Sequence, residues 1–303
     1  MPGDALVTGA HGFAGGHLVE RLRADGHDVA GPASDELDLR DAERTRRLVA
    51  DVAPERVFHL AALASVGRSW DEPRRALLEN QEMTLNLLEA VRAEAPSARV
   101  MLASSGEVYG APRELPLSED APLRPQNPYA VSKAAADLLG ELYADAADLH
   151  VVRTRAFNHA GPGQSDDYVI GTITRQIAEA EAAGASEVVL HTGNPDSGRD
   201  FTDVRDVVAA YTLALDAAPG AYNVASERAV TVRDLVGMAR GLTEITIRHE
   251  VDPARVRDHD VLEVRGSAGK LRDATGWRPE IPLERTVADA LEHWRRALRA
   301  APA

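Results

Sequence analysis

Apolar residues in the first half of the chain recur in short runs of strand length, separated by longer segments with helical spacing. Such runs occupy residues 4–8, 56–62, 98–103 and 150–155, and apolar residues at helical spacing fill 17–22 and 77–93. Another helix is expected to begin at Tyr129. Strands that alternate with helices in this way predict an α/β fold built on a doubly wound parallel sheet.

The pattern becomes less regular after residue 155, and we expect a smaller second α/β domain there. An apolar run at 188–191 resembles another sheet strand, and 207–217 has the spacing of a helix that we assign to the first domain. The boundaries predicted are therefore residues 1–155 plus 188–218 for the first domain, and 156–187 plus 219–303 for the second. Two further helices are expected at 232–240 and 283–298.

The first apolar run leads into a glycine-rich turn that has the context of a dinucleotide-binding loop. Gly9, Gly12 and Gly15 fall between the predicted strand and the predicted helix. In such loops the first glycine makes the tight turn, the second admits a pyrophosphate and the third lets helix and strand pack closely. The N-terminus of the helix, with Phe13 and Ala14, then offers unpaired N–H groups to the phosphates.

Further cofactor contacts are expected after the next strands. We expect a second strand at 27–31, which makes 56–62 the third and 98–103 the fourth. Sites that prefer NAD usually carry an acid at the end of this second strand, but Ser34 stands here, with no acid before Asp35 and with Arg40 nearby. NADP(H) is therefore favoured and NAD(H) remains possible. Asp38 and Leu39 either lie against the adenine or precede a helix as its cap. The remaining candidates follow or lie near the third strand: Leu60, Ala61, Ala62 and Asn80.

Tyr129 and Lys133 are the central candidates for chemistry. They lie four positions apart and share one helix face. An ammonium beside a phenol favours the phenolate, and lowering the tyrosine pKa from about 10 by roughly three units corresponds to about 4 kcal/mol. The competing interpretation is an ordinary tyrosine and lysine on a helix surface. Ser105 follows the fourth strand and is expected to converge on the same sheet edge.

Composition and charge narrow the possible functions. The 303 residues include 44% hydrophobic and 27% charged residues, which is typical of a globular protein, and the formal net charge is −14. That charge argues against nonspecific binding to nucleic acid or anionic membranes. There is no cysteine, no histidine cluster typical of a catalytic metal, no signal-peptide pattern and no apolar run near the ~20 residues of a membrane span. A cytoplasmic, metal-free protein is expected.

These motifs together resemble the extended short-chain dehydrogenase/reductase family, whose members act on nucleotide sugars. The resemblance covers essentially the whole chain. It rests on the following segments: residues 8–15, His59–Ala62, Ser104–Gly110, Pro128–Lys133 and Arg199–Phe201. It implies a Rossmann-type first domain and a second domain that binds the nucleoside-diphosphate sugar. Within the family, residues 155–164 and 199–206 are most similar to reductases of GDP-4-keto-6-deoxymannose.

The resemblance also implies a role for each matching residue. Tyr129 is the expected acid/base, Lys133 the residue that orients the nicotinamide ribose, and Ser105 the hydrogen-bond donor to the reacting oxygen. Asn158, Arg199 and Arg257 are expected to hold the sugar nucleotide. Surface ion pairs are the alternative role for the two arginines. A homodimer through the helices at 77–93 and 129–144 is a further family expectation, although their apolar faces could pack on the sheet instead.

One departure from the family bears on the reaction. Dehydratases of this family use acidic or hydroxyl side chains directly after the serine, where this chain has Gly106 followed by Glu107. Carbonyl reduction needs only Tyr129 as a proton donor, so reduction of a nucleotide-linked 4-keto-6-deoxy sugar is favoured, with Glu107 retained as a candidate catalytic residue. The expected reaction converts GDP-4-keto-6-deoxy-D-mannose to GDP-D-rhamnose. The alternatives are a 4-epimerase, a 4,6-dehydratase and a non-catalytic nucleotide-sensing module.

Overall fold

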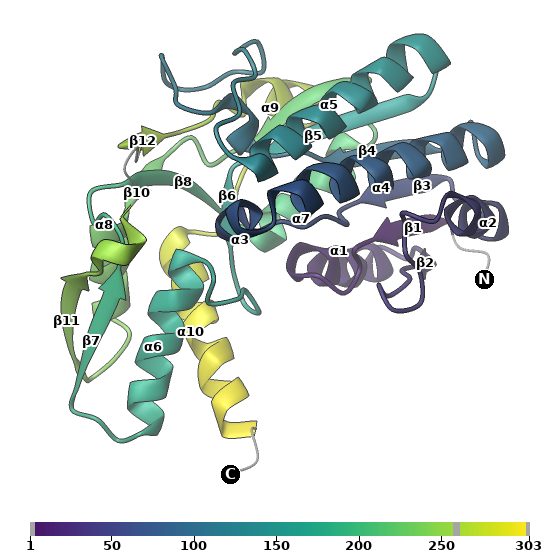
Figure 1. The fold of residues 1–303 in the computed structure, drawn as a ribbon. Helices are drawn as coiled ribbons and strands as arrows, with labels where there is room; N and C mark the ends of the chain where they lie inside the picture. The colour runs from purple at the N-terminus through teal and green to yellow at the C-terminus, as the bar shows by residue number, and fades with distance from the viewer. Residues whose placement is uncertain (1–3, 257–260, 301–303) are drawn as a thin grey trace.

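The larger part of the molecule is built on a parallel sheet of six strands (Figure 1). The computed structural model describes residues 4–256 and 261–300. The strand order is β2-β1-β3-β4-β5-β9. The strands are β1 (Ala5–Thr8), β2 (Val29–Ala30), β3 (Arg56–His59), β4 (Arg99–Ala103), β5 (His150–Ala156) and β9 (Gly220–Val224). The doubly wound parallel α/β fold expected from the sequence is confirmed.

Helices cover both faces of this sheet because its strands are apolar on both faces. Neighbouring residues within a strand point to opposite sides, so Val57 and Phe58 enter different hydrophobic clusters. One face packs on α2 (Ala42–Val52), α4 (Pro73–Glu94) and α5 (Pro128–Ala147), and the other on α1 (Phe13–Ala24), α7 (Val204–Ala214) and α9 (Gly269–Thr275). The short helices α3 (Val66–Asp71) and η1 (Gly106–Tyr109) lie in the connections.

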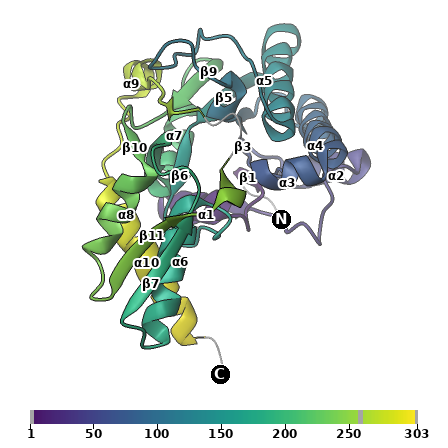
Figure 2. The same cartoon turned by 60° about the vertical axis from the view of Figure 1, so that its left-hand side comes forward.

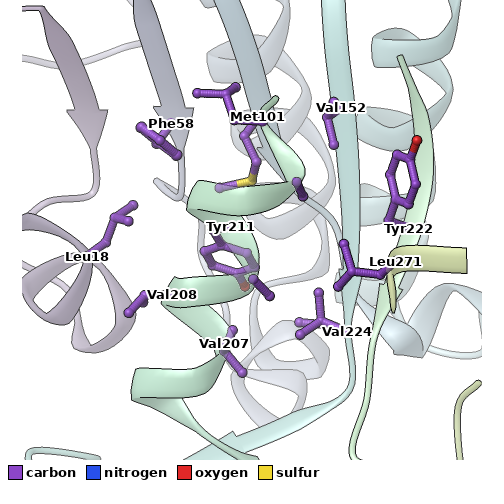
Figure 3. Close-up of a cluster of buried hydrophobic side chains, with 14 of the residues drawn as sticks. Leu18, Phe58, Met101, Val152, Val207, Val208, Tyr211, Tyr222, Val224 and Leu271 are labelled. Carbon is purple, nitrogen blue, oxygen red and sulfur yellow. The ribbon is translucent and has the colours of Figure 1, made fainter. Parts of the chain in front are cut away.

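The α7 face of the sheet holds a core cluster that is drawn in Figure 3. Tyr211 of α7 lies under the sheet among Met101, Val152 and Val224, and each of these four side chains is buried. The apolar face of α7 therefore belongs to the core of the large sheet. This agrees with the expectation that the helix predicted at 207–217 returns to the first part of the chain.

The second part of the molecule lies to one side of the large sheet, as Figure 2 shows. Its strands are β6 (Asn158–Ala160), β7 (Glu187–Thr192), β8 (Gly198–Asp203), β10 (Ala229–Thr231), β11 (Thr246–Val251) and β12 (Glu263–Val264). Its helices are α6 (Val169–Ala182), α8 (Val232–Arg240), η2 (Pro253–Arg255) and α10 (Leu283–Ala300). A separate hydrophobic cluster, with Ile173, Leu190 and Leu291, holds these elements together.

Two strands are placed differently from the sequence prediction. The run at 188–191 does form a strand, β7. The prediction that it belongs to the large sheet is wrong, because β7 pairs in parallel with β11 in a separate sheet. The strand that completes the large sheet is β9, which pairs with β5 and lies beyond the predicted boundary at residue 219. Both strands are short apolar runs, so their sequences do not distinguish the two sheets. The division into two domains stays a prediction.

No helix within residues 4–256 and 261–300 combines the length and apolar character needed to span a membrane. In the same ranges, no group of three or more histidine and acidic side chains is arranged to hold a metal ion.

Candidate active site

The glycine turn after β1 is folded so tightly that side chains are excluded from it. Gly9 adopts a φ of +75°, a left-handed conformation that favours glycine, and Gly12 N donates to Gly9 O at 3.0 Å. A Cβ on Gly15 would stand 1.9 Å from the Gly9 carbonyl oxygen. Helix α1 begins at Phe13, and its cap residue Gly12 supplies no side-chain hydrogen bond. The first N–H groups of α1 are therefore left for a ligand such as a phosphate.

This turn faces the point where the strand order of the large sheet reverses. The chain goes from β1 outward to β2, and then returns to place β3 on the other side of β1. Ligands of doubly wound sheets bind at such a reversal, outside the carboxyl ends of the strands. A cleft of about 770 Å³ lies there. The predicted residues that line it are Gly9, Gly12, Phe13, Ala14, Gly15, Ser34, Asp38, Leu39, Leu60, Ala61, Ala62, Ser105, Glu107, Tyr129, Lys133 and Asn158.

One end of the cleft carries a compact ion-pair network. Arg40 donates to both carboxylate oxygens of Asp38 at 2.6–3.0 Å, and its Nη1 donates to Glu79 at 2.8 Å. The Arg40 guanidinium holds the pKa of Asp38 down to about 2. The cap of α2 is Asp41, which accepts from the backbone N–H of Arg44. Asp38 is therefore a cleft residue and not the helix cap.

Tyr129, Lys133 and Ser105 meet at the other end. Asn127 caps α5 by accepting from Ala130 N at 2.8 Å, which starts the helix where Tyr129 and Lys133 share a face toward the cleft. Ser105 stands directly before η1, two residues after β4 ends, and its hydroxyl lies close enough to the Tyr129 phenol to lower the pKa of that phenol. Lys133 Nζ donates to the carbonyl oxygen of Ala103 at 2.7 Å.

The pKa shift predicted for Tyr129 is wrong in direction. Burial raises the pKa of the phenol above its usual range, although the hydrogen bond with Ser105 opposes that rise. Tyr168 and Glu107 raise the phenol pKa further. Burial also lowers the pKa of Lys133 to about 8, so the ammonium is itself disfavoured. The sequence shows the Tyr–Lys spacing but not the burial of both groups. The phenol consequently stays protonated near neutral pH.

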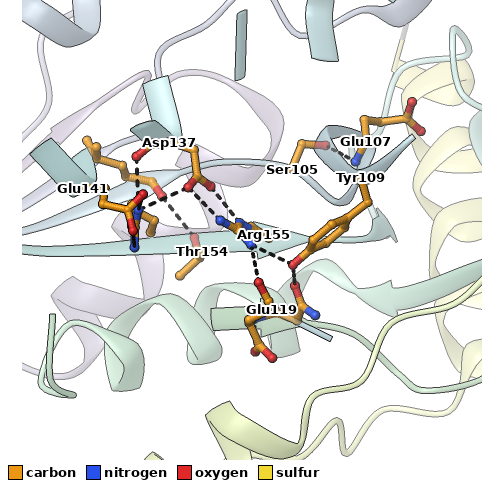
Figure 4. Close-up of polar contacts among 11 residues, drawn as sticks. Ser105, Glu107, Tyr109, Glu119, Asp137, Glu141, Thr154 and Arg155 are labelled. Carbon is orange, nitrogen blue, oxygen red and sulfur yellow. Dashed lines mark hydrogen bonds and ion pairs between the residues drawn. The ribbon is translucent and has the colours of Figure 1, made fainter. Parts of the chain in front are cut away.

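Glu107 also lies in the cleft, close to the serine. Its carboxylate accepts from Asn127 Nδ2 at 3.1 Å, and its backbone N–H donates to Ser105 Oγ at 3.2 Å. Figure 4 shows Ser105 and Glu107 at the start of the turn that continues to Tyr109. Asn127 thus caps α5 and also holds the Glu107 carboxylate. Among the residues that line this cleft, Glu107 supplies the only carboxylate beside Ser105.

Two predicted binding residues, Asn80 and Arg199, are not among the residues that line the cleft. Asn80 is buried, its Oδ1 accepts from Leu63 N at 2.8 Å, and its Nδ2 donates to Ser132 Oγ at 2.9 Å. It therefore holds Leu63, which does line the cleft. Arg199 lies on β8, and its Nη1 donates to the carbonyl oxygens of Gly198 and Val261. Arg257 lies outside the described residues.

Several lining residues were missed by the sequence analysis. His159 and Gln164 belong to the loop after β5, where Gln164 Nε2 donates to the carbonyl oxygen of His159 at 2.7 Å. Tyr168 precedes α6 and Tyr211 lies on α7, and both raise the pKa of Tyr129. The loop could have been suspected from its position after a strand. Tyr211 has no such signal, because it continues the apolar face of a helix.

The cleft residues fit a nicotinamide dinucleotide. Gly9, Gly12 and Gly15 carry no side chain at the points of the turn where a pyrophosphate must come close to the backbone. Lys133 has three N–H donors and uses one of them on Ala103, which leaves two for ribose hydroxyls. The Ser104 hydroxyl lines the same cleft, is buried, and has no hydrogen-bond partner among the described residues. A polar ligand atom would satisfy it.

Comparison with known proteins gives consistent matches over nearly the whole chain. Residues 33–290 match the family model for GDP-mannose 4,6 dehydratase. GDP-6-deoxy-D-mannose reductase of Pseudomonas aeruginosa is 37% identical over 299 residues, which cover 97% of this chain and 98% of that protein. Among solved structures, RMD from Pseudomonas aeruginosa in complex with NADPH has a TM-score of 0.88 at 35% identity, covering 97% and 99% of the two chains.

A solved structure of an epimerase resembles this chain about as closely as the reductase structure does. UDP-glucose 4-epimerase of Thermus thermophilus in complex with NAD superposes with a TM-score of 0.86 at 32% identity, covering 97% of this chain and 99% of that chain. Both structures carry a nicotinamide dinucleotide, one with and one without the extra phosphate. The matches thus support a nicotinamide dinucleotide cofactor and leave the choice between NAD and NADP to the residues of this cleft.

Proposed function

Because this chain belongs to the GDP-mannose 4,6-dehydratase family of extended short-chain dehydrogenases/reductases, we propose that it reduces a nucleotide-linked 4-keto-6-deoxy sugar. It is an enzyme of the NAD(P)-dependent oxidoreductase type. The substrate that we favour is GDP-4-keto-6-deoxy-D-mannose, with GDP-D-rhamnose as the product. The similarity to GDP-6-deoxy-D-mannose reductase supports this choice of base and sugar.

The observation that carries the proposal is a protonated phenol next to a serine hydroxyl in the cleft. Burial raises the pKa of Tyr129, so its proton is present at neutral pH and available for donation. Reduction of a ketone places negative charge on the oxygen at C4, and a proton donor must neutralise it. Ser105 lines the same cleft as Tyr129, and we infer that its hydroxyl donates to the same oxygen as charge develops there.

The chain's own residues supply binding, orientation and the proton. The bound nicotinamide supplies hydride chemistry. Lys133 offers its two remaining N–H donors to the ribose, and the glycine turn with the N-terminus of α1 holds the pyrophosphate. Tyr129 passes its proton to the oxygen at C4 and is reprotonated from solvent through the mouth of the cleft.

A second candidate, 4,6-dehydration, is favoured by one specific observation. The Glu107 carboxylate lines the cleft beside Ser105, and elimination needs such a base in addition to Tyr129. Against it, Gly106 provides no side chain, and a Cβ there would lie 3.1 Å from the ring of Phe157. Glu107 also accepts a hydrogen bond from Asn127, which holds it toward the start of α5. Simple reduction requires only Tyr129 and Ser105 and does not need the Glu107 carboxylate.

We favour NADPH over NADH as the electron donor. Ser34 lines the cleft where NAD-preferring sites carry an acid, and Arg40 lies in the same lining. Arg40 is paired with Asp38 and Glu79, so a 2′-phosphate must compete with two carboxylates for it. We therefore expect a preference for NADPH that is moderate in size and sensitive to salt.

We also propose that the protein is a homodimer. Helices α4 and α5 pack side by side and leave apolar side chains exposed on their outer faces: Leu78, Leu85, Val131, Leu138 and Leu142. Leu138 and Leu142 are 54% and 55% exposed, one turn apart on α5. A two-fold axis would place this same face of a second chain against it, which is the commonest oligomer geometry.

The proposed function is tested with a panel of GDP-, UDP- and dTDP-4-keto-6-deoxy sugars, each supplied with NADPH or NADH. A reductase consumes one reduced cofactor for each sugar and works best with the GDP sugar and NADPH. An epimerase keeps its NAD through purification, releases it only on denaturation, and shows no net cofactor loss. A protein that binds the sugars without turning over any of them would be a sensing module, and the reductase proposal would be abandoned.

A further inference from the structure

A buried polar network lies behind the cleft and is drawn in Figure 4. Its centre is Arg155 on β5, which is 5% exposed and faces Asp137 on α5, which is 1% exposed. Arg155 Nε and Nη2 donate to the two carboxylate oxygens of Asp137, each at 2.9 Å. Two parallel bonds between planar groups hold both the distance and the relative orientation of strand and helix.

The other side of the same guanidinium holds the turn after β4. Arg155 Nη1 donates to the Tyr109 hydroxyl at 3.0 Å, and its Cζ lies 5.3 Å from the centre of the Tyr109 ring. The Tyr109 hydroxyl in turn donates to Asn223 Oδ1 on β9 at 2.6 Å. Arg155 Nη1 also donates to the carbonyl oxygen of Glu119, in the long loop that leads to α5.

The two ends of this network continue into the two elements that carry the chemistry. Asp137 lies one helical step of four residues beyond Lys133 and eight beyond Tyr129, on α5. Tyr109 is the last residue of the short helix η1, and Ser105 caps its start. Neither Arg155, Asp137 nor Tyr109 lines the cleft. The network therefore lies outside the surface that would contact the cofactor and the sugar nucleotide. It connects α5, which carries the Tyr129 phenol, to η1, which follows Ser105.

Stability alone is a poor explanation for such a network. A buried ion pair costs about as much to desolvate as it returns, and apolar residues of the same shape often stabilise a core equally well. The planar fork of an arginine supplies orientation instead, which a lysine cannot reproduce. Because a misplacement of about 1 Å can slow a reaction on the order of 100-fold, the orientation of α5 against η1 matters for the transfer of a proton.

We propose that Arg155, Asp137 and Tyr109 are positioning residues that hold the Tyr129 phenol against the Ser105 hydroxyl. The inference rests on the proposed function, because the contact that they hold is the one that protonates the reduced sugar. They act through α5 and η1 and do not touch the substrate.

The first test compares Tyr109→Phe and Arg155→Lys with a control on the same helix. Asp145 is exposed and lies about two turns beyond Asp137 on α5. Asp145→Asn should leave turnover unchanged. Tyr109→Phe, which removes one hydroxyl, and Arg155→Lys, which keeps the charge but loses the fork, should each lower kcat roughly 10- to 100-fold. The KM for NADPH should stay within about twofold of wild type, since the glycine turn is untouched.

The decisive measurement is a double-mutant cycle with Ser105→Ala. If Tyr109 acts by holding the serine–phenol contact, then Tyr109→Phe adds little further loss once the serine hydroxyl is gone. If the network only stabilises the fold, the fold-reductions in kcat of the two single variants multiply in the double variant. Multiplied losses, or a Tyr109→Phe protein with wild-type kcat and only a lowered Tm, would overturn the proposal.

Hydrogen exchange, measured without substrate, tests the positioning role independently of the proposed reaction. Hydrogen exchange along residues 128–137 of α5 should be faster in Tyr109→Phe than in Asp145→Asn, because η1 no longer restrains the start of the helix. If the wild-type protein reduces no 4-keto sugar, the proposed function fails, and the exchange result still decides whether the network restrains α5. Equal exchange in the two variants would contradict the coupling itself.

Discussion

Two neighbouring glycines at the start of α1 should respond in opposite ways to the same substitution. A Cβ on Gly15 would meet only backbone atoms, with the Gly9 carbonyl oxygen at 1.9 Å and the Ala10 Cα at 3.0 Å. A Cβ on Gly16 would meet nothing nearer than the Ala10 carbonyl oxygen at 3.9 Å, which is an ordinary contact. Gly15→Ala and Gly16→Ala therefore add the same methyl group to the same turn of the same helix.

The magnitudes follow from the contacts. Alanine is favoured over glycine inside a helix by about 1 kcal/mol, so Gly16→Ala should raise the free energy of unfolding by roughly 0.5–1 kcal/mol. Gly15→Ala receives the same gain, but overpacking against backbone costs typically ~1–3 kcal/mol. Relief of the 1.9 Å contact requires the turn and the helix to separate by more than an ångström. The clash should therefore outweigh the gain, and the turn that holds the pyrophosphate should be displaced.

The assay is chemical denaturation combined with titration of NADPH. Gly16→Ala should be as stable as wild type or more so, and should bind NADPH with unchanged affinity. Gly15→Ala should be less stable by about 1–2 kcal/mol and should bind NADPH at least ~10-fold more weakly, since ~1.4 kcal/mol corresponds to a factor of ten. If Gly15→Ala binds NADPH as wild type does, or if both variants are equally impaired, the assignment of this turn to the pyrophosphate is wrong.

Further predictions concern the chemistry, the cofactor and the assembly. Tyr129→Phe should lower kcat by about 10²–10⁴-fold with unchanged Tm, and near wild-type turnover would remove this phenol from the reaction. Because burial lowers the pKa of Lys133 to about 8, kcat/KM for NADPH should fall as the pH rises through that value and the ammonium loses its proton; a flat profile would exclude a role for that charge. Arg40→Ala should weaken NADPH roughly tenfold and NADH little, as measured by kcat/KM with each cofactor, and equal losses would argue against a contact with the 2′-phosphate. Replacing Leu138 and Leu142 with glutamate should yield monomers in sedimentation velocity, whereas an unchanged dimer would place the interface elsewhere.

Local patterns in the sequence were sufficient to predict strands β1 to β5 of the large sheet and the glycine turn. The turn is defined by Gly9, Gly12 and Gly15 within a few residues, between a strand and a helix that are each recognisable from their own spacing. The approach of Ser105 to Tyr129 follows from the same sheet, because the carboxyl ends of parallel strands lie at one edge. Both residues line the cleft at that edge.

What the sequence could not show depends on contacts between distant segments. The partner of β7 is β11, which lies more than fifty residues later, and the apolar run at 188–191 would look the same in either sheet. The direction of the Tyr129 pKa shift depends on burial by surrounding segments, which the spacing of Tyr129 and Lys133 does not reveal. Arg199 matches a family motif, but the motif does not show where its side chain points.

The most direct test of the account is to follow the hydride itself. NADPH carrying deuterium at the transferable position is mixed with GDP-4-keto-6-deoxymannose and the protein, and the sugar product is analysed by mass spectrometry and NMR. The account predicts one deuterium at C4 of the 6-deoxy sugar for each NADPH consumed, and loss of this labelling in Tyr129→Phe. A product without label, or a 4-epimer formed with no loss of NADPH, would contradict it.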